Sequence, residues 1–175
     1  DALPILYVDE QKSLVYIGTH AGGLTVLHRN SGKMESFNQL NSQLVNENVY
    51  AILPDKGGNL LLGTLSALVS FNPEKKSFTT IDKEKDGTPF TSQRITILFR
   101  DSHKRLWVGG EEGISVFQQE EIEIEKVPIL PESSVTKTFT NCIYEAANGI
   151  IWVGTREGFY CFNEKEKKKI GRAHV

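Results

Sequence analysis

The stretch Trp152-Val153-Gly154-Thr155 decides the fold, because close variants of it occur three more times in the chain. The other copies are Tyr16-Ile17-Gly18-Thr19, Leu61-Leu62-Gly63-Thr64 and Trp107-Val108-Gly109-Gly110. The steps between successive motif glycines are 45, 46 and 45 residues. A period this regular is the signature of a repeat architecture, in which each repeat is one structural unit.

Each motif lies between two other short apolar runs. The run before it ends near an aspartate in three repeats (Asp9, Asp55 and Asp101), and the fourth repeat has Ala146 there. The run after it spans residues 24–27, 68–71, 114–117 and 159–162, and a looser fourth segment follows in the first three repeats. Short β-branched or aromatic runs between turn residues are typical of strands, and no stretch shows a sustained helical period. We therefore expect four strands per repeat, three in the last repeat, and almost no helix.

A tight turn is expected between the first run and the motif. Gly57-Gly58-Asn59 and Asn148-Gly149 occupy this turn in the second and fourth repeats. Such residues accept the positive φ that a tight hairpin requires. The third repeat has Ser102-His103-Lys104-Arg105 instead, so we predict a different turn geometry in that repeat.

Several of these runs are apolar on both faces, which is typical of strands that are covered on both sides. Four-stranded sheets that pack face to face are the blades of a β-propeller. The sequence thus predicts an all-β propeller fragment of about four consecutive four-stranded blades, whose ring is not closed. A solenoid would need a different period or helices, and a β-sandwich would not repeat its motif at this interval.

The repeats divide the chain into a propeller part and a short end. Residues 1–163 hold the four repeats, at about 3–40, 49–81, 95–127 and 139–163, and we expect them to be part of a larger propeller. Residues 164–175 form a truncated end. Residues 170–175 match the conceptual translation of a common sequencing-library adapter, so we expect these six to be non-biological.

Composition excludes several classes of partner. The net charge is −2 and the pI is about 6.1, and no basic face is clustered, so nucleic acid is not expected to bind. The basic run at residues 165–169 is interpreted as a solvated tail. No apolar stretch approaches the ~20 residues that a membrane-spanning helix needs, so this segment is not expected to contact a membrane.

The combined pattern V-x-x-I/L-x-x-D-x-x-G-x-L-W-V-G-T-x-x-G-L-x-x-F resembles the two-component regulator propeller repeat. The third repeat carries it at Ile95, Leu98, Asp101, Leu106-Trp107-Val108-Gly109, Gly113-Ile114 and Phe117. The fourth carries it at Ile143, Gly149, Ile151-Trp152-Val153-Gly154-Thr155, Gly158-Phe159 and Phe162. The second repeat departs from it most, with Leu61 in place of the tryptophan and Ala67 in place of the second glycine.

This resemblance implies a place in the extracytoplasmic sensor region of a hybrid two-component histidine kinase, and hence a periplasmic location. Such sensors are linked to the detection of oligosaccharides, so the implied partners are an oligosaccharide and the remaining blades of the same parent chain. A homodimer is a further expected partner. The alternative is an interaction or dimerisation scaffold that binds no small molecule. An enzyme of the propeller lyase or glycosidase type is a third class, for which the sequence offers no converging catalytic set.

Candidate residues fall into two groups. The motif glycines (Gly18, Gly63, Gly109 and Gly154) and the two tryptophans (Trp107 and Trp152) are expected to be structural, because large apolar residues recur at the tryptophan position in every repeat. A sugar-stacking role for the tryptophans is the alternative. The turns that follow the motifs are expected to line one rim, where propellers place recognition residues. His20, Glu112 and Arg156 are the predicted ligand contacts in these turns.

No catalytic residue, cofactor or metal is predicted. The four histidines (His20, His28, His103 and His174) lack metal-ligand spacing. Glu111 and Glu112 with Asp101 could form a carboxylate set, but acid–base catalysis needs side chains that converge, and adjacent residues in a turn point apart. Catalysis is therefore not expected.

The two cysteines are expected to be free and buried. Their repeat positions place Cys142 on the first strand and Cys161 on the third strand of the last blade. Two inter-strand spacings separate such residues by about 9.6 Å, which exceeds the Cα separation of about 7 Å that a disulfide allows.

Overall fold

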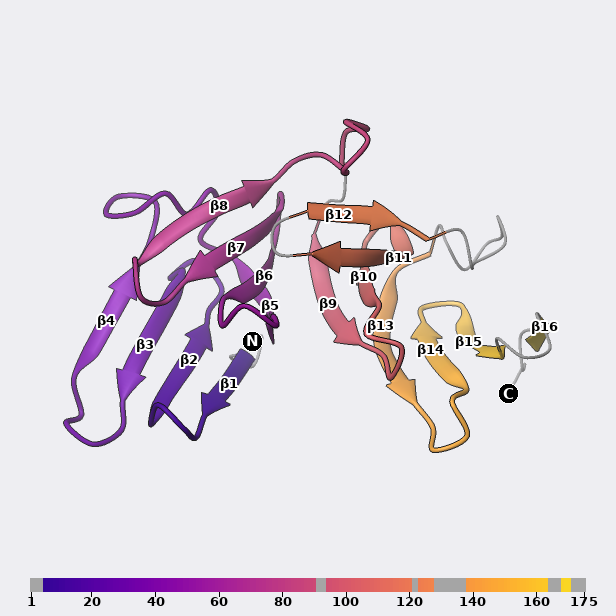
Figure 1. The fold of residues 1–175 in the computed structure, drawn as a ribbon, viewed down its shortest axis with the longest axis horizontal. Coiled ribbons are helices and arrows are strands. Elements are labelled where there is room, and N and C mark those ends of the chain that lie inside the picture. Colours follow the sequence, from indigo (N-terminus) through magenta and orange to yellow (C-terminus); the bar gives the residue numbers. More distant parts are fainter. Residues whose placement is uncertain (1–4, 91–93, 121–122, 128–137, 164–167, 171–175) are drawn as a thin grey trace.

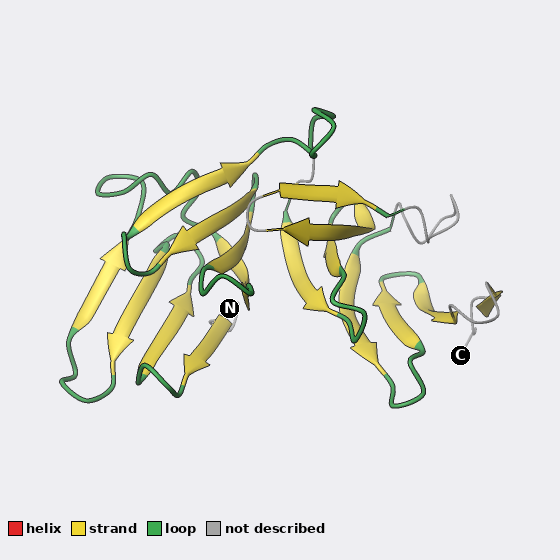
Figure 2. Cartoon of the chain, in the orientation of Figure 1, coloured by secondary structure: helices red, strands yellow, loops and turns green. Residues whose placement is uncertain are grey.

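The computed structural model describes residues 5–90, 94–120, 123–127, 138–163 and 168–170. These residues form four separate four-stranded antiparallel sheets, and none of them is helical (Figure 2). The strands of each sheet neighbour one another in chain order. The predicted all-β propeller fragment is confirmed, and each repeat forms one blade.

The blades have the following strands. The first blade contains β1 (Ile5–Asp9), β2 (Leu14–Gly18), β3 (Leu24–His28) and β4 (Met34–Phe37). The second contains β5 (Val49–Pro54), β6 (Leu60–Thr64), β7 (Leu68–Asn72) and β8 (Ser77–Ile81). The third contains β9 (Ile95–Arg100), β10 (Leu106–Gly110), β11 (Gly113–Glu120) and β12 (Glu123–Lys126). The fourth contains β13 (Thr140–Glu145), β14 (Ile151–Thr155), β15 (Gly158–Asn163) and β16 (Lys168–Ile170).

The fourth blade therefore has a fourth strand, which the sequence did not predict. Three residue pairs join β15 to β16, from Asn163 with Lys168 to Cys161 with Ile170. Such pairing uses main-chain groups that any edge strand offers, so it needs no apolar pattern. Of the six residues expected to be non-biological, Ile170 lies in β16, and residues 171–175 lie outside the described part of the chain.

The four blades stand side by side in an open arc (Figure 1). The first strands of the blades contact one another in succession, β1 with β5, β5 with β9 and β9 with β13. They are the inner strands of the arc. Among the described residues no sheet closes the ring, as the sequence predicted.

The hydrophobic core is divided into three clusters, one between each pair of neighbouring blades. Tyr16 and Leu24 of the first blade pack against Leu62 and Phe71 of the second. Buried side chains of the second and third blades, among them Leu61 and Leu106, form the middle cluster. Trp107 and Val116 meet Ile151 and Tyr160 between the third and fourth blades. The aromatic or leucine residue of the first three motifs thus faces the following blade.

The motif glycines allow this close approach. A Cβ atom added to Gly18 would lie 2.8 Å from Cγ1 of Val49, and one added to Gly63 would lie 2.6 Å from the carbonyl oxygen of Ile95. Val49 and Ile95 begin the inner strands of the next blades. At these positions a side chain would push two blades apart.

The turn before each motif has one geometry in all four repeats, so the prediction for the third repeat was wrong. The residue five positions before the motif glycine has a positive φ every time: 53° at Ser13, 80° at Gly58, 65° at Lys104 and 79° at Gly149. The carboxylate of Asp101 accepts a hydrogen bond from the amide of Arg105 at 2.8 Å and helps to hold the lysine in this conformation. The hairpin requires a positive φ at this position, and Ser13 and Lys104 adopt it although they are not glycines.

The prediction that both cysteines are buried was wrong for Cys142, which is exposed, whereas Cys161 is buried. Both are free thiols, and they lie on β13 and β15 as expected. Cys142 shares a face with Tyr144 and Trp152, since Tyr144 pairs with Trp152 across the sheet. The described residues place no further blade on that face, which explains the exposure of the thiol.

Candidate functional site

One rim of the arc is held together by main-chain hydrogen bonds. In the second, third and fourth blades the turn after the motif lies beside the residue that precedes the inner strand: the amide of Leu65 donates to the carbonyl oxygen of Asn48 at 3.2 Å, that of Glu111 to Arg94 at 3.4 Å and that of Arg156 to Phe139 at 3.1 Å. A bond between blades, from the amide of Arg94 to the carbonyl oxygen of Leu65, measures 2.7 Å. The rim is therefore a fixed scaffold for its side chains.

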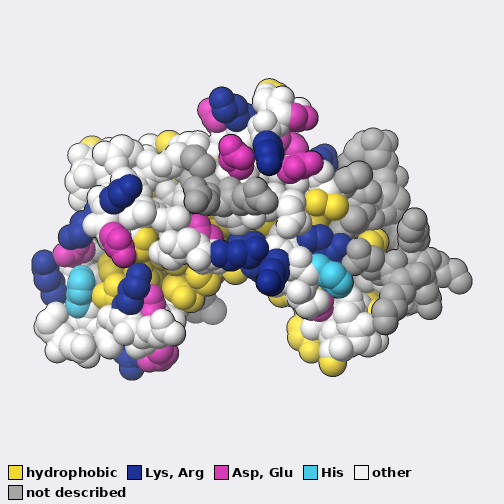
Figure 3. All heavy atoms as spheres, viewed as in Figure 1, with side chains coloured by type: hydrophobic (Ala, Val, Ile, Leu, Met, Phe, Trp, Pro, Cys, Tyr) yellow, Lys and Arg dark blue, Asp and Glu magenta, His cyan; other side chains and the backbone are white. Residues whose placement is uncertain are grey.

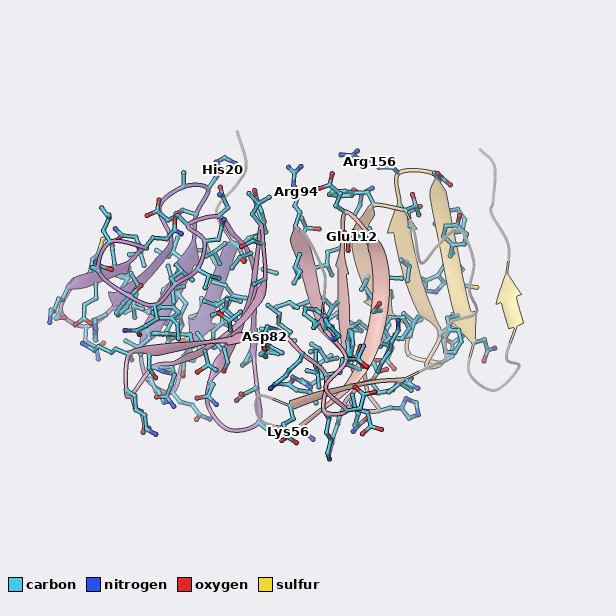
Figure 4. The ribbon with its side chains drawn as sticks, turned by 90° about the horizontal axis from the view of Figure 1, so that it is seen from above. His20, Lys56, Asp82, Arg94, Glu112 and Arg156 are labelled. Atoms are coloured by element: carbon cyan, nitrogen blue, oxygen red, sulfur yellow. The ribbon has the colours of Figure 1, made fainter. Side chains whose placement is uncertain are left out.

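Five side chains from all four blades form a continuous row on this rim. The rings of His20 and Tyr50 are 6.1 Å apart. The Cζ atom of Arg94 lies 5.8 Å from the Tyr50 ring centroid and 6.0 Å from that of Phe139. Arg156 also lies over the Phe139 ring, with its Cζ atom 4.3 Å from the ring centroid. We call these five residues the cation–aromatic row. Figure 4 shows His20, Arg94 and Arg156 along one edge of the molecule and Lys56 at the opposite edge.

Arg94 is the central member of the row and has an unusual backbone. Its φ of 48° lies in the left-handed region, which non-glycine residues seldom adopt and which is frequent at functional sites. The side chain is half-buried, and its Nε atom is buried without a hydrogen-bond partner among the described residues.

Other buried polar atoms near this part of the rim are also unpaired. Four buried side-chain atoms lack a partner in the described part of the chain, and three of them belong to Asn48, Arg94 and Thr140. Asn48 and Arg94 directly precede the inner strands β5 and β9, and Thr140 begins β13. Buried polar groups are normally hydrogen-bonded, and an exception calls for an explanation such as water or a ligand.

The arginines of the row carry no counter-charge within the described residues. Arg29 and Arg105 pair with Glu10 and Asp101, but no ion pair of this kind joins Arg94 or Arg156 to a carboxylate in the described ranges.

Glu112, the third predicted ligand contact, is not part of the row. It lines a separate cavity of about 270 Å³ with Phe90, Phe117 and Lys126. Of the three predicted contacts, the structure brings His20 and Arg156 into one row and places Glu112 elsewhere.

The two tryptophans lie in different surroundings. Trp107 is fully buried between the third and fourth blades, and its Nε1 donates to Oδ2 of Asp101 at 2.8 Å. Trp152 has 37% of its surface exposed and lies 5.8 Å from the ring of Phe159. Neither residue belongs to the cation–aromatic row.

Tyr50, Arg94 and Phe139 were missed by the reasoning from sequence. A signal for two of them was present, because Arg94 and Phe139 each stand fifteen residues before a motif glycine. Leu3 and Asn48 occupy the same repeat position. The chemistry of this position varies between repeats, as it does in the rim turns. Tyr50 gave no such signal, since it lies at an irregularity in the pairing of β5 with β6.

The carboxylates considered for catalysis do not converge. Asp101 precedes β10 and Glu111 and Glu112 follow it, so the length of the strand separates them. Asp101 is buried and bound to Arg105 and Trp107. Within the described ranges no group of three or more histidine, cysteine, aspartate or glutamate residues is placed to hold a metal ion.

Comparisons with known proteins agree with the repeat pattern. The model of the family described as two component regulator propeller matches residues 133–157, which include the fourth motif. The chain thus carries a two-component regulator propeller repeat, and the resemblance seen in its sequence is confirmed. Histidine kinase P4 of Formosa agariphila is 27% identical over 143 residues, which are 78% of this chain and 10% of that protein.

Solved structures show the same fold in larger chains. The extracellular domains of two hybrid two component systems from B. thetaiotaomicron superpose with TM-scores of 0.77 and 0.70 at 19% and 21% identity. The similar regions are 98% and 94% of this chain and 22% of each of those chains. The chain therefore spans about a tenth of its curated relative and a minor part of each solved structure. In the described ranges, no helix has the length and apolar character that crossing a membrane requires.

Proposed function

We propose that this chain is a ligand-sensing segment of the extracytoplasmic propeller region of a two-component sensor histidine kinase, located in the periplasm. The proposed ligand is an oligosaccharide. The repeat type, the similarity to a histidine kinase and the fold shared with extracellular domains of hybrid two component systems support this assignment. The segment itself is proposed to bind and not to catalyse, because the carboxylates beside β10 lie at opposite ends of that strand.

The cation–aromatic row is the observation that carries the proposal. Arg94, Arg156 and His20 offer hydrogen-bond donors to sugar hydroxyl groups, and the rings of Tyr50 and Phe139 beside them hold the donors in place and add apolar surface. Ligand sites combine such apolar surface with a few placed polar groups. Because the row draws on all four blades, a bound ligand contacts several blades at once. Binding would transmit a signal if one arrangement of the blades binds the ligand more tightly than another.

Calorimetric titration of the complete ectodomain with a panel of glycan fragments tests the proposal. At least one fragment is expected to bind, and Phe139→Ala is expected to weaken its binding. Lys56→Ala is the control, because Lys56 lies at the opposite edge of the molecule (Figure 4). Absence of binding to any glycan would contradict the proposal.

A second candidate function, a dimerisation scaffold, is supported by a different observation. Tyr144, Trp152 and Phe159 are 65%, 37% and 41% exposed on the fourth blade. Contiguous exposed apolar surface is a mark of interaction sites. Sedimentation of the complete ectodomain with and without glycan separates the two functions. A dimer that forms through a blade face, in an ectodomain that binds no glycan, would favour the scaffold.

A further inference from the structure

We propose that the cation–aromatic row binds an acidic oligosaccharide, whose carboxylate groups pair with Arg94 and Arg156, the two guanidinium groups that lie over the rings of Tyr50 and Phe139. This inference rests on the proposed sensing function and names the chemical class of the ligand.

The first argument is the missing counter-charge. Both arginines of the row lack an ion pair with any carboxylate in the described part of the chain, whereas Arg29 and Arg105 have one. Arg94 is in addition half-buried, with an unpaired Nε atom. A guanidinium presents several donors in a planar fork that matches a carboxylate. An anionic ligand supplies the partner that the protein does not.

The second argument is the geometry around Phe139. The two guanidinium carbons lie 6.0 and 4.3 Å from this one ring centroid. The Phe139 ring therefore holds two cationic groups close together, and a carboxylate that binds beside it can pair with either. The Tyr50 ring also lies beside a guanidinium group, since the Cζ atom of Arg94 is 5.8 Å from its centroid. The ring centroid of His20 is 6.1 Å from that of Tyr50. Successive aromatic and cationic groups fit a chain of acidic sugars better than a single small anion.

The test uses the complete ectodomain and matched pairs of glycans. The probes are tetrasaccharides of galacturonate, mannuronate, guluronate and glucuronate, each paired with its carboxyl-reduced form. At least one uronate tetrasaccharide is expected to bind roughly tenfold or more tightly than its reduced partner, because charge-assisted hydrogen bonds are lost on reduction. Its affinity is also expected to fall as ionic strength rises, since salt screens exposed charges.

Variants locate the site. Arg94→Gln and Arg156→Gln are each expected to lower the affinity for the uronate roughly tenfold or more and to leave the affinity for the reduced form nearly unchanged. Arg156 is exposed, so its variant is expected to keep the melting temperature of the parent and remains informative where Arg94→Gln disturbs folding. Arg29→Gln is the matched control, because Arg29 follows β3 whereas the turn of His20 precedes that strand.

The possible failures are distinguishable. Binding of reduced glycans as tightly as uronates would overturn the acidic class and leave the sensing function standing. Uronate binding that neither arginine variant weakens would overturn the assigned site. If none of these uronates binds in either form while another glycan of the broader panel does, the acidic class is overturned and the sensing function stands, whereas the failure of every glycan contradicts the sensing function itself.

Discussion

Gly63 lies at the tightest of the contacts between blades. A Cβ atom there would lie 2.6 Å from the carbonyl oxygen of Ile95, a main-chain atom that cannot move without its strand. A Cβ atom on Gly154 would meet only the Sγ of Cys142, in its own blade. The same repeat position is therefore constrained to different degrees along the chain.

The first prediction follows from this difference. Gly63→Ala is expected to lower the free energy of unfolding of this chain by about 1–3 kcal/mol, the usual effect of overpacking, and Gly154→Ala by clearly less. Urea denaturation followed by circular dichroism measures both. Gly57→Ala is the control, since a Cβ atom there makes only ordinary contacts. Equal losses at positions 63 and 154 would contradict the explanation.

The second prediction concerns Glu35 on β4. Its carboxylate is 2.6 Å from Nζ of Lys76 in the second blade and 3.0 Å from Nζ of Lys33. Lys76 foremost, and then Lys33, lower the pKa of Glu35 from 4.5 to about 2. An acid with a lowered pKa contributes stability that is fully present above its ordinary pKa and is lost as pH falls through the folded pKa. The melting temperature of the parent chain should thus exceed that of Glu35→Gln at neutral pH, and the difference should shrink as the pH falls below 4.5 and vanish below about pH 2. A difference that persists there would show that the carboxylate charge is not responsible.

At the scale of the strand, one position of the repeat has two environments. Trp107 on β10 is fully buried by the fourth blade, and Trp152 on β14 is 37% exposed. The contribution of a motif residue to stability therefore depends on whether a following blade covers its side chain.

The third prediction compares these two strands. Trp107→Ala is expected to lower the stability of this chain by about 3–5 kcal/mol, as is usual when a buried aromatic residue is truncated. It also removes the hydrogen bond to Asp101. Trp152→Ala should cost well under half as much. Thermal and urea denaturation of the two variants, compared with the parent, would reveal any reversal of this order.

Much of the strand pattern could be predicted from the sequence, because strand propensity and repeat spacing are local properties. The motif, its neighbouring apolar runs and the absence of helix all follow from them. Lys104 was misjudged because a required backbone angle can override residue preference. β16 was missed because edge pairing needs only main-chain groups.

The site was only partly predictable, for a different reason. His20 and Arg156 were found because they occupy turns that the repeat alignment marks. Tyr50, Arg94 and Phe139 join them only through contacts between blades, and such contacts depend on how the sheets stack. Glu112 lies in an aligned turn but lines another cavity, which the alignment does not show.

At the scale of the whole molecule, charge and apolar surface are unevenly placed. Acidic and basic side chains gather on the segment that projects above the arc in Figure 3, where Glu84, Lys85 and Asp86 line a shallow depression with Glu125. The outer faces of the first and last blades carry exposed apolar side chains, which include Leu6, Val8, Tyr144 and Trp152.

The fourth prediction follows from these faces. The isolated chain is expected to be poorly soluble and to associate in a concentration-dependent way, because exposed apolar sheet faces invite contact. Tyr144→Ser combined with Trp152→Ser should reduce the association, whereas Met34→Ser, which removes an exposed apolar side chain from the edge strand β4, should not. Sedimentation velocity over a range of concentrations measures the effect. A sharply melting monomer at all concentrations would contradict this prediction.

The contact of Gly18, Gly63 and Gly109 with the inner strand of the following blade gives the arc a direction. The face of the fourth blade that carries Trp152 corresponds to the faces of the earlier blades that pack against the following blade. The face of the first blade that carries Leu6 and Val8 corresponds to the faces that pack against the preceding blade. Two unlike, complementary faces cannot pair by a twofold axis. Copies that join through them must stack head to tail in a heterologous interface. Such assembly has two endpoints, a finite ring if the rotation per copy closes and an unbounded helical fibre if it does not.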